Sequence, residues 1–190
     1  MEPLHQEFYT RNPDVVAQAL LGKTLVRHLG SAVLSGIIVE TEAYFGDMDP
    51  ASRAFKGRKS YNAVMFEAPG RLFVYMVHGW WLLNVVAHRE GETGAVLIRA
   101  LEPTRGLEYM FKNRSVKSQT QLTTGPGKLT QALNITKNLN GHDITSGEKI
   151  TILDDGLKTT DVATSNRIGV THDLPQELRF FVQGNLFVSR

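Results

Sequence analysis

The chain has 190 residues, a net charge of +2 and no cysteine. This length suits one domain, expected over residues 1–190, with a single hydrophobic core. The lack of cysteine excludes disulfides, iron–sulfur clusters, thiolate zinc sites and cysteine nucleophiles. No apolar run approaches the roughly 18 residues that span a membrane, and residues 1–5 lack a secretory-signal pattern, so we expect a cytoplasmic protein.

The predicted elements, in chain order, are a helix, a strand-rich middle, a second helical part and three closing strands. They are a helix after Asn12 that stops at Gly22, a hairpin of residues 23–29 and 32–44, a second hairpin of residues 71–78 and 82–87, a buried strand at 94–101, helices at 104–114 and around 128–133, and strands at 149–153, 168–170 and 178–182. This order predicts a single mixed α/β domain with a curved antiparallel sheet, flanking helices and a protruding hairpin.

Basic residues are concentrated in the middle of the chain. Between Arg53 and Lys137 there are 13 Lys or Arg residues, five Glu and no Asp. Such a segment could form a basic face for a polyanion, most commonly nucleic acid. Folding could equally mix these charges with the acidic remainder, and composition does not choose between the two.

The segment 37–44 carries the most informative pattern. Side chains alternate along a strand, so Glu40, Glu42 and Tyr44 should share one face, with the two carboxylates about 7 Å apart. Paired carboxylates can break glycosidic bonds, because one protonates the leaving group and the other activates water. The simpler alternative, an edge strand with solvated glutamates, is favoured by the pattern alone.

Arg99 is the one charge in the apolar run 95–101. A buried charge must be paired or hydrogen-bonded. It is therefore either part of a structural ion pair with any glutamate or the partner of a catalytic carboxylate, for which Glu42 is the natural candidate. The sequence leaves both possibilities open.

The second predicted hairpin carries His78, Trp80 and Trp81 around its turn. Tryptophans near a turn usually belong to a core or an interface. Aromatic rings at a hairpin tip can also enter a base stack. The core interpretation is favoured until DNA binding is established.

Residues 125–129 do not form a Walker loop, because Leu122 stands at the first glycine position and Leu129 follows Lys128. They predict either plain helix capping or a helix start where Lys128 contacts a phosphate. The histidines lack the spacing of a metal site, so no metal or other cofactor is implied.

Taken together, these segments resemble the alkyladenine (3-methyladenine, methylpurine) DNA glycosylase family. The matching motifs keep their order along nearly the whole chain, at residues 20–23, 36–44, 64–66, 70–75, 83–86, 95–103, 125–129, 167–170 and 179–182. The resemblance implies a monomeric, monofunctional hydrolase, associated with the nucleoid, that acts on double-stranded DNA in base excision repair. Its expected substrates are alkylated or deaminated purines such as 3-methyladenine, hypoxanthine and ethenoadenine.

The resemblance also implies catalytic roles. Glu42 would be the general base that activates water against the anomeric carbon. Arg99 and the carbonyl of Ile168 would hold that water. The hairpin tip would fill the gap left by the flipped nucleotide. His78 stands where animal members place the residue that enters this gap, but the segment up to Asn84 is one residue shorter, so Trp80 or Trp81 could serve instead.

For the base pocket, the resemblance implies that Tyr44 and Tyr75 line it and that Asn84 rejects guanine by crowding its exocyclic amine. Arg53 departs from the family, which usually has histidine at this position. A guanidinium can stack on a base but repels a cationic one. If Arg53 enters the pocket, neutral lesions such as hypoxanthine should be favoured over cationic methylpurines.

Two other functions remain as alternatives. A nucleic-acid-binding module without catalysis would bind DNA equally well after Glu42→Gln and release no base. A hydrolase of free nucleosides or sugars would use Glu40 together with Glu42 and would need no basic face.

Overall fold

A computed structural model describes residues 2–154, 156 and 161–189 of the protein. The strands are β1 (Glu2–Pro3), β2 (Thr24–Leu29), β3 (Ala32–Phe45), β4 (Leu72–Val77), β5 (Trp80–Val86), β6 (Gly94–Arg105), β7 (Ile150–Asp154), β8 (Val162–Ser165) and β9 (Arg179–Val182). The helices are α1 (Gln6–Tyr9), α2 (Pro13–Leu20), α3 (Leu107–Asn113) and α4 (Pro126–Ala132), with short 3-10 helices η1 (Ser60–Phe66), η2 (Gln119–Gln121), η3 (Lys137–Leu139) and η4 (Ile144–Ser146).

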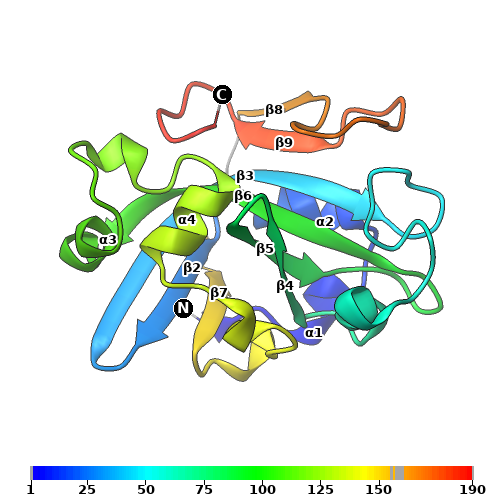
Figure 1. The fold of residues 1–190 in the computed structure, drawn as a ribbon, viewed down its shortest axis with the longest axis horizontal. Coiled ribbons are helices and arrows are strands. Elements are labelled where there is room, and N and C mark those ends of the chain that lie inside the picture. The colour runs from blue at the N-terminus through cyan, green and yellow to red at the C-terminus, as the bar shows by residue number, and fades with distance from the viewer. Residues whose placement is uncertain (1, 155, 157–160, 190) are drawn as a thin grey trace.

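The strands form one curled antiparallel sheet (Figure 1). Its order is β1-β7-β2-β3-β6-β5-β4, with β9 paired to β3 and β8 paired to β9. The main core contains apolar side chains of the sheet and of α2 and α4. The expected mixed α/β fold with a curved antiparallel sheet is therefore confirmed.

The first predicted elements are also confirmed. α2 begins at Pro13, directly after Asn12, although the Asn12 side chain makes no capping hydrogen bond. Gly22 follows the helix with φ of 82°, a conformation that glycine adopts easily. β2 and β3 then form the expected hairpin around residues 30–31.

Two expectations around α3 and β8 were wrong. β6 continues to Arg105 because its outer end pairs with β3 at Ser35, so the helix expected from residue 104 starts only after Gly106. Residues 168–170, expected as a strand, lie in the loop between β8 and β9. The strand that pairs with β9 comes earlier, as β8.

The turn of the second hairpin was placed too late. It consists of His78 and Gly79, with φ of 48° and 83°, between the paired residues Val77 and Trp80. Positive φ at both central residues is the geometry of a two-residue type I′ turn, whose twist matches that of the strands. Trp80 and Trp81 are consequently the first residues of β5 and project to opposite faces of the hairpin.

β3 is the strand that positions the site. One edge pairs with β6, and the other pairs first with β2 and then, at Glu40–Glu42, with β9. Irregular register with β6 surrounds Glu40, and such bulges re-aim side chains. The hydroxyl of Thr41 donates to the carbonyl of Ala17 in α2 at 2.8 Å, so the neighbouring residue Glu42 faces away from α2.

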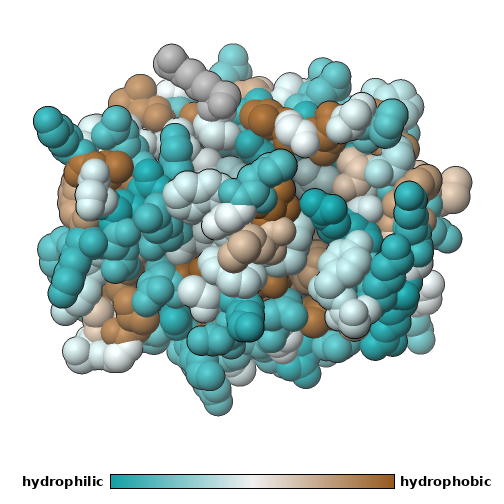
Figure 2. Space-filling model, viewed as in Figure 1, coloured by the Kyte–Doolittle hydropathy of each residue, from teal (hydrophilic) through white to brown (hydrophobic). Residues whose placement is uncertain are grey.

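On the face of the molecule shown in Figure 2, hydrophobic residues form small groups separated by hydrophilic ones. Among the described residues, no helix combines the length and apolar character needed to cross a membrane. Several large apolar side chains are nonetheless exposed, including that of Trp80.

Candidate active site

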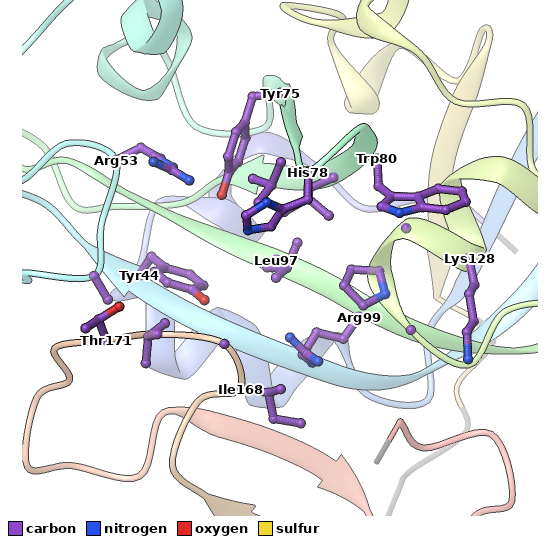
Figure 3. A pocket seen from close by; sticks show the side chains of 18 of the residues that line it. Tyr44, Arg53, Tyr75, His78, Trp80, Leu97, Arg99, Lys128, Ile168 and Thr171 are labelled. Carbon is purple, nitrogen blue, oxygen red and sulfur yellow. The ribbon is translucent and has the colours of Figure 1, made fainter.

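A cavity of about 780 Å³ lies between the β4–β5 hairpin, the start of α4, the segment after β3 and the β8–β9 loop (Figure 3). The residues expected at the site that line it are Tyr44, Arg53, Tyr75, His78, Trp80, Arg99, Lys128 and Ile168. Folding thus brings together residues from distant parts of the sequence. Glu42, Asn84 and Trp81 are not part of this lining.

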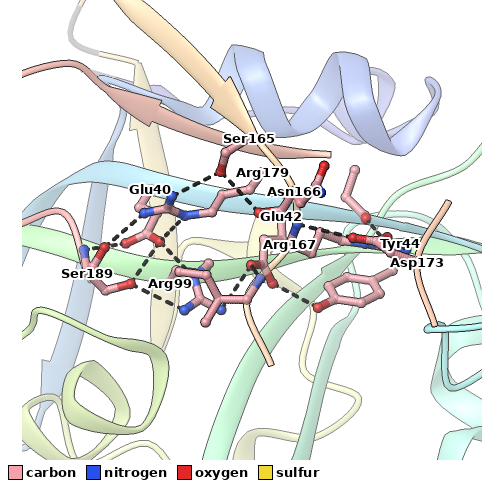
Figure 4. Close-up of polar contacts among 12 residues, drawn as sticks. Glu40, Glu42, Tyr44, Arg99, Ser165, Asn166, Arg167, Asp173, Arg179 and Ser189 are labelled. Atoms are coloured by element: carbon pink, nitrogen blue, oxygen red, sulfur yellow. Dashed lines mark hydrogen bonds and ion pairs between the residues drawn. The ribbon is translucent and has the colours of Figure 1, made fainter. Parts of the chain in front are cut away.

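Glu42 lies behind the cavity wall and has no exposed surface. Its Oε1 accepts a hydrogen bond from the backbone N–H of Ile168 at 2.8 Å and pairs with Nη1 of Arg99 at 3.1 Å (Figure 4). Its Oε2 accepts a hydrogen bond from the hydroxyl of Tyr44 at 2.8 Å. Since Tyr44, Arg99 and Ile168 line the cavity, Glu42 is one layer of side chains away from it.

Burial raises the pKa of Glu42 above its ordinary value, because desolvation disfavours the charged form. The charge of Arg99 and the two hydrogen bonds from Ile168 and Tyr44 act in the opposite direction. A carboxylate with a raised pKa is a stronger base once it has lost its proton. The position is therefore suited to accepting a proton from water.

Glu40 is also fully buried, so the alternative of solvated glutamates on this strand was wrong. Its Oε1 accepts hydrogen bonds from Nε of Arg99, Nε of Arg179 and Oγ of Ser189, each at 2.8 Å, and its Oε2 accepts one from the N–H of Ser189 at 2.7 Å. Four donors thus hold this carboxylate. The C-terminal residues and β9 close over it.

Arg99 forms ion pairs with both Glu40 and Glu42, which meets the expectation of a buried partner. Its role beside a catalytic carboxylate stays a prediction. Burial alone would lower the pKa of its guanidinium, but the charges of Glu42 and Glu40 outweigh this effect and raise the pKa. The guanidinium therefore remains ionised beside Glu42.

Two tyrosine rings, those of Tyr44 and Tyr75, line the cavity (Figure 3). The guanidinium carbon of Arg167 lies 4.5 Å from the centroid of the Tyr44 ring. Tyr75 stacks on Phe73, with ring centroids 4.7 Å apart and planes within 14°. Burial raises the pKa of both tyrosines above 10, so both hydroxyls are protonated at neutral pH.

Arg53 does enter the cavity lining. Its guanidinium carbon lies 5.1 Å from the centroid of the Tyr75 ring, a distance at which a cation and an aromatic face attract each other. The Arg53 side chain remains exposed to solvent as well. The cavity thus has a positive charge next to one of its rings.

Asn84 lies in a small recess of about 10 Å³ next to the main cavity, with Tyr44, Arg53 and Tyr75 also in its lining. It is 4% exposed, and its Nδ2 donates a hydrogen bond to the carbonyl of Phe73 at 3.0 Å. This bond fixes the side-chain amide beside the space between the two tyrosines.

The hairpin and α4 form the opposite side. His78 is exposed at the turn, and Trp80 is 50% exposed. A Cβ at Gly127 would lie 2.9 Å from Cβ of Trp80, so this glycine allows the tryptophan to lie directly on α4. Trp81 instead packs against the core, and Lys128 is exposed at the cavity edge.

Arg167 is a residue of this site to which the sequence assigned no role. It lies in a loop without the periodicity of a helix or strand, so no pattern marked it as buried. Its side chain has no exposed surface and pairs with Asp49 and Asp173, both at 2.6 Å. Among the described residues, no group of three or more His, Asp or Glu side chains is placed to hold a metal ion.

The chain is similar to proteins of one family. The family model described as methylpurine-DNA glycosylase (MPG) matches residues 7–186. A relative from Koribacter versatilis is 42% identical over 194 residues, covering 100% of this chain and 94% of the relative. One from Chlorobium phaeovibrioides is 43% identical over 192 residues (100% and 98%), and one from Aeropyrum pernix is 40% identical over 190 residues (98% and 93%). Each of the three is named "Putative 3-methyladenine DNA glycosylase".

Proposed function

Because the chain belongs to the methylpurine-DNA glycosylase family, we propose that its cavity receives a damaged purine flipped out of double-stranded DNA and that water activated by Glu42 hydrolyses the N-glycosidic bond. The protein is a DNA glycosylase and therefore a hydrolase that acts in DNA repair. Its substrates on this proposal are alkylated and deaminated purines of the 3-methyladenine, hypoxanthine and ethenoadenine types.

The placement of Glu42 is the observation that carries the proposal. An ionised carboxylate offers about four acceptor positions. Tyr44, Ile168 and Arg99 occupy three of them, which leaves one on Oε2 for a water molecule. Since Glu42 has no exposed surface, that water would enter through the cavity wall, and bound DNA would then shield it from bulk solvent. The carbonyl of Ile168 remains our candidate for a further contact to the water.

Nucleotide flipping explains the rest of the cavity. Extruding a base costs a few kcal/mol of stacking and pairing, which must be offset by contacts in the pocket. The rings of Tyr44 and Tyr75 would stack on the flipped base, and Asn84 would discriminate against the guanine amine. His78, at the tip of the hairpin, would occupy the vacated space, with Trp80 beside it.

Phosphate contacts supply the remaining affinity on this proposal. Lys128 and Arg114 line the cavity on the α4 side, where they can approach the DNA backbone. Each phosphate contact made by Lys or Arg makes binding weaken as salt increases. All the groups invoked come from one chain, so we propose that the protein acts as a single-domain monomer without a cofactor.

The nucleoside-hydrolase alternative needs Glu40 as a second catalytic carboxylate. Glu40 accepts four hydrogen bonds from Arg99, Arg179 and Ser189, and of these three residues only Arg99 lines the cavity. Since Glu40 is fully buried and both Arg179 and Ser189 lie outside the cavity lining, Glu40 is screened from a substrate in the cavity. This favours a mechanism with one catalytic carboxylate, as in the glycosylase proposal.

Arg53 gives the proposal a preference among lesions. Its positive charge beside Tyr75 repels a cationic base such as 7-methylguanine, whereas it can donate hydrogen bonds to a neutral one such as hypoxanthine. We expect hypoxanthine to be released faster than 7-methylguanine from otherwise identical duplexes, and Arg53→His to reduce this difference. Equal or faster release of 7-methylguanine by the unmodified protein would refute the preference.

The proposal is tested by incubating the protein, Glu42→Gln and Glu92→Gln with a duplex that contains one hypoxanthine. Glu92 is exposed, so its variant is the matched control for a charge-to-amide change. We expect free base from the unmodified protein and the control but none from Glu42→Gln, and strand breaks only after alkali. Base release by Glu42→Gln at the unmodified rate would contradict the proposed role. Binding without base release by every form would support the non-catalytic alternative.

A further inference from the structure

One wall of the cavity is a loop with little apolar packing of its own. This wall is formed by residues 168–172 of the β8–β9 loop. Four of these five residues are exposed, and Val170 is partly buried. Arg167, directly before the wall, is buried and has no exposed side-chain surface. The position of the wall therefore depends on what Arg167 contacts.

The guanidinium of Arg167 is held by two carboxylates. Nη1 and Nη2 donate to the two oxygens of Asp49, at 2.6 and 2.8 Å. Nη2 and Nε donate to Oδ1 of Asp173, at 2.6 and 2.9 Å. Nη1 also donates to the carbonyl of Ala43 in β3 at 2.9 Å. Arg167 directly precedes the wall residues 168–172 and Asp173 directly follows them, so this arginine ties both ends of the wall to β3.

Asp49 extends the connection to the other side of the cavity. Its carboxylate also accepts hydrogen bonds from the backbone N–H groups of Phe45 and Ala51, each at 3.0 Å. Ala51 and the nearby Arg53 line the cavity. The turn that follows β3 and the β8–β9 loop are thus fixed by the same buried ion pair.

The same arginine reaches the two functional groups between these loops. Its guanidinium lies against the ring of Tyr44, 4.5 Å from the centroid. The next backbone N–H, that of Ile168, is the donor to Glu42. A displacement of Arg167 must move this N–H, because only one peptide unit separates it from the anchored residue.

We propose that Arg167 is a positioning residue for the hydrolytic step: it holds the Ile168 N–H against Glu42 and the Tyr44 ring against the cavity. This inference rests on the proposed role of Glu42 as the base. It assigns a function to an ion pair, Arg167–Asp49, in which neither side chain has exposed surface.

A purely structural role for Arg167 would lower stability without changing the chemistry of Glu42. The two roles differ in pH dependence. The hydrogen bond from Ile168 lowers the pKa of Glu42, so losing that bond must raise the pKa further. The acid limb of the rate profile, where the rate falls as Glu42 becomes protonated, would then move to higher pH. Partial unfolding would instead lower the rate by the same factor at every pH.

The experiment compares the unmodified protein, Arg167→Lys, Asp173→Asn and Ile152→Val. Lysine keeps the charge but cannot bridge two carboxylates with a planar fork. Asp173→Asn weakens one of the two ion pairs and leaves Asp49 in place. Ile152 is fully buried in β7, away from the cavity, so Ile152→Val is the control for lost stability. Thermal unfolding, affinity for an undamaged duplex and single-turnover release of hypoxanthine are measured across pH.

We expect Arg167→Lys to slow base release by about tenfold to a hundredfold, the cost of displacing a catalytic group by about 1 Å. Its acid limb should move to higher pH while its affinity for undamaged DNA stays nearly unchanged, and Asp173→Asn should show the same changes at smaller size. Ile152→Val should lower the melting temperature and change neither rate nor limb. The inference would be overturned if Arg167→Lys is folded and its acid limb lies at the same pH as that of the unmodified protein, whether its rate is normal or reduced. If Glu42→Gln also releases base normally, the proposed function fails as well; if Glu42→Gln is inactive, only this inference fails.

Discussion

Removing the hydroxyl of Tyr44 is a direct test of how the ionisation of Glu42 affects the rate. Tyr44→Phe removes a donor 2.8 Å from Oε2 and leaves the ring that would stack on the base. Hydrogen bonds to charged groups contribute about 1.5–3 kcal/mol. Water does not readily replace this hydrogen bond, since the carboxylate has no exposed surface. The loss falls on the ionised form, so the pKa of Glu42 rises further above its ordinary value.

The effect on rate depends on the pH. At pH values below the pKa of Glu42 the rate follows its ionised fraction, so Tyr44→Phe should be about tenfold to a hundredfold slower there, the equivalent of about 1.5–3 kcal/mol. At pH values above that pKa the carboxylate is ionised in both proteins, and the more basic one in the variant should work at least as well. The two rate profiles should therefore converge as the pH rises.

The assay is single-turnover release of hypoxanthine over about pH 5 to 9, a range that should include the acid limb of a general base with a raised pKa. Thermal unfolding of both proteins at each pH serves as the control for folding. A Tyr44→Phe rate that is reduced by one constant factor at every pH would refute this reasoning. The hydroxyl would then act on the substrate rather than on Glu42.

Three further outcomes follow from the same contacts. Lys128→Ala should weaken binding to any duplex and reduce the slope of log affinity against log salt by about 1. Fluorescence anisotropy at several salt concentrations measures this slope. An unchanged slope would place Lys128 away from the phosphates. Glu40→Gln should lower the free energy of unfolding by about 3–5 kcal/mol in urea titrations, because it leaves Arg99 and Arg179 with an incomplete partner. For Glu42, protonation stabilises the fold fully below its unfolded pKa of about 4.5, and this contribution is lost as pH rises through the raised folded pKa. The stability of Glu42→Gln relative to the unmodified protein should therefore increase with pH, and a difference that is constant with pH would contradict the raised pKa.

Local patterns in the sequence were enough to place the residues on β3. Strand alternation put Glu40, Glu42 and Tyr44 on one face, and the contacts of all three with Arg99 or with each other agree with this. An arginine inside an apolar run required a buried partner, and it has two. These inferences depend only on strand periodicity and on the cost of an unpaired buried charge.

The other parts of the site depend on contacts between distant segments. Arg167 meets Asp49 across 118 positions of sequence, and no local periodicity reports such a contact. The turn at His78 was missed because a non-glycine residue with positive φ has no strong sequence signal, and the adjacent tryptophans suggested a longer loop. Loop walls of this kind are set by a few long-range polar contacts rather than by a repeating apolar pattern.

The two glutamates of β3 show how neighbouring identical residues acquire different roles. Both are fully buried and both pair with Arg99. Glu40 receives four hydrogen bonds, two of them from Ser189, and two of its three partner residues, Arg179 and Ser189, lie outside the cavity lining. Glu42 has three polar contacts, each from a residue that itself faces the cavity. We propose that these surroundings, rather than the presence of a carboxylate pair, suit Glu42 to accept a proton from water and leave Glu40 to hold Arg99 in place.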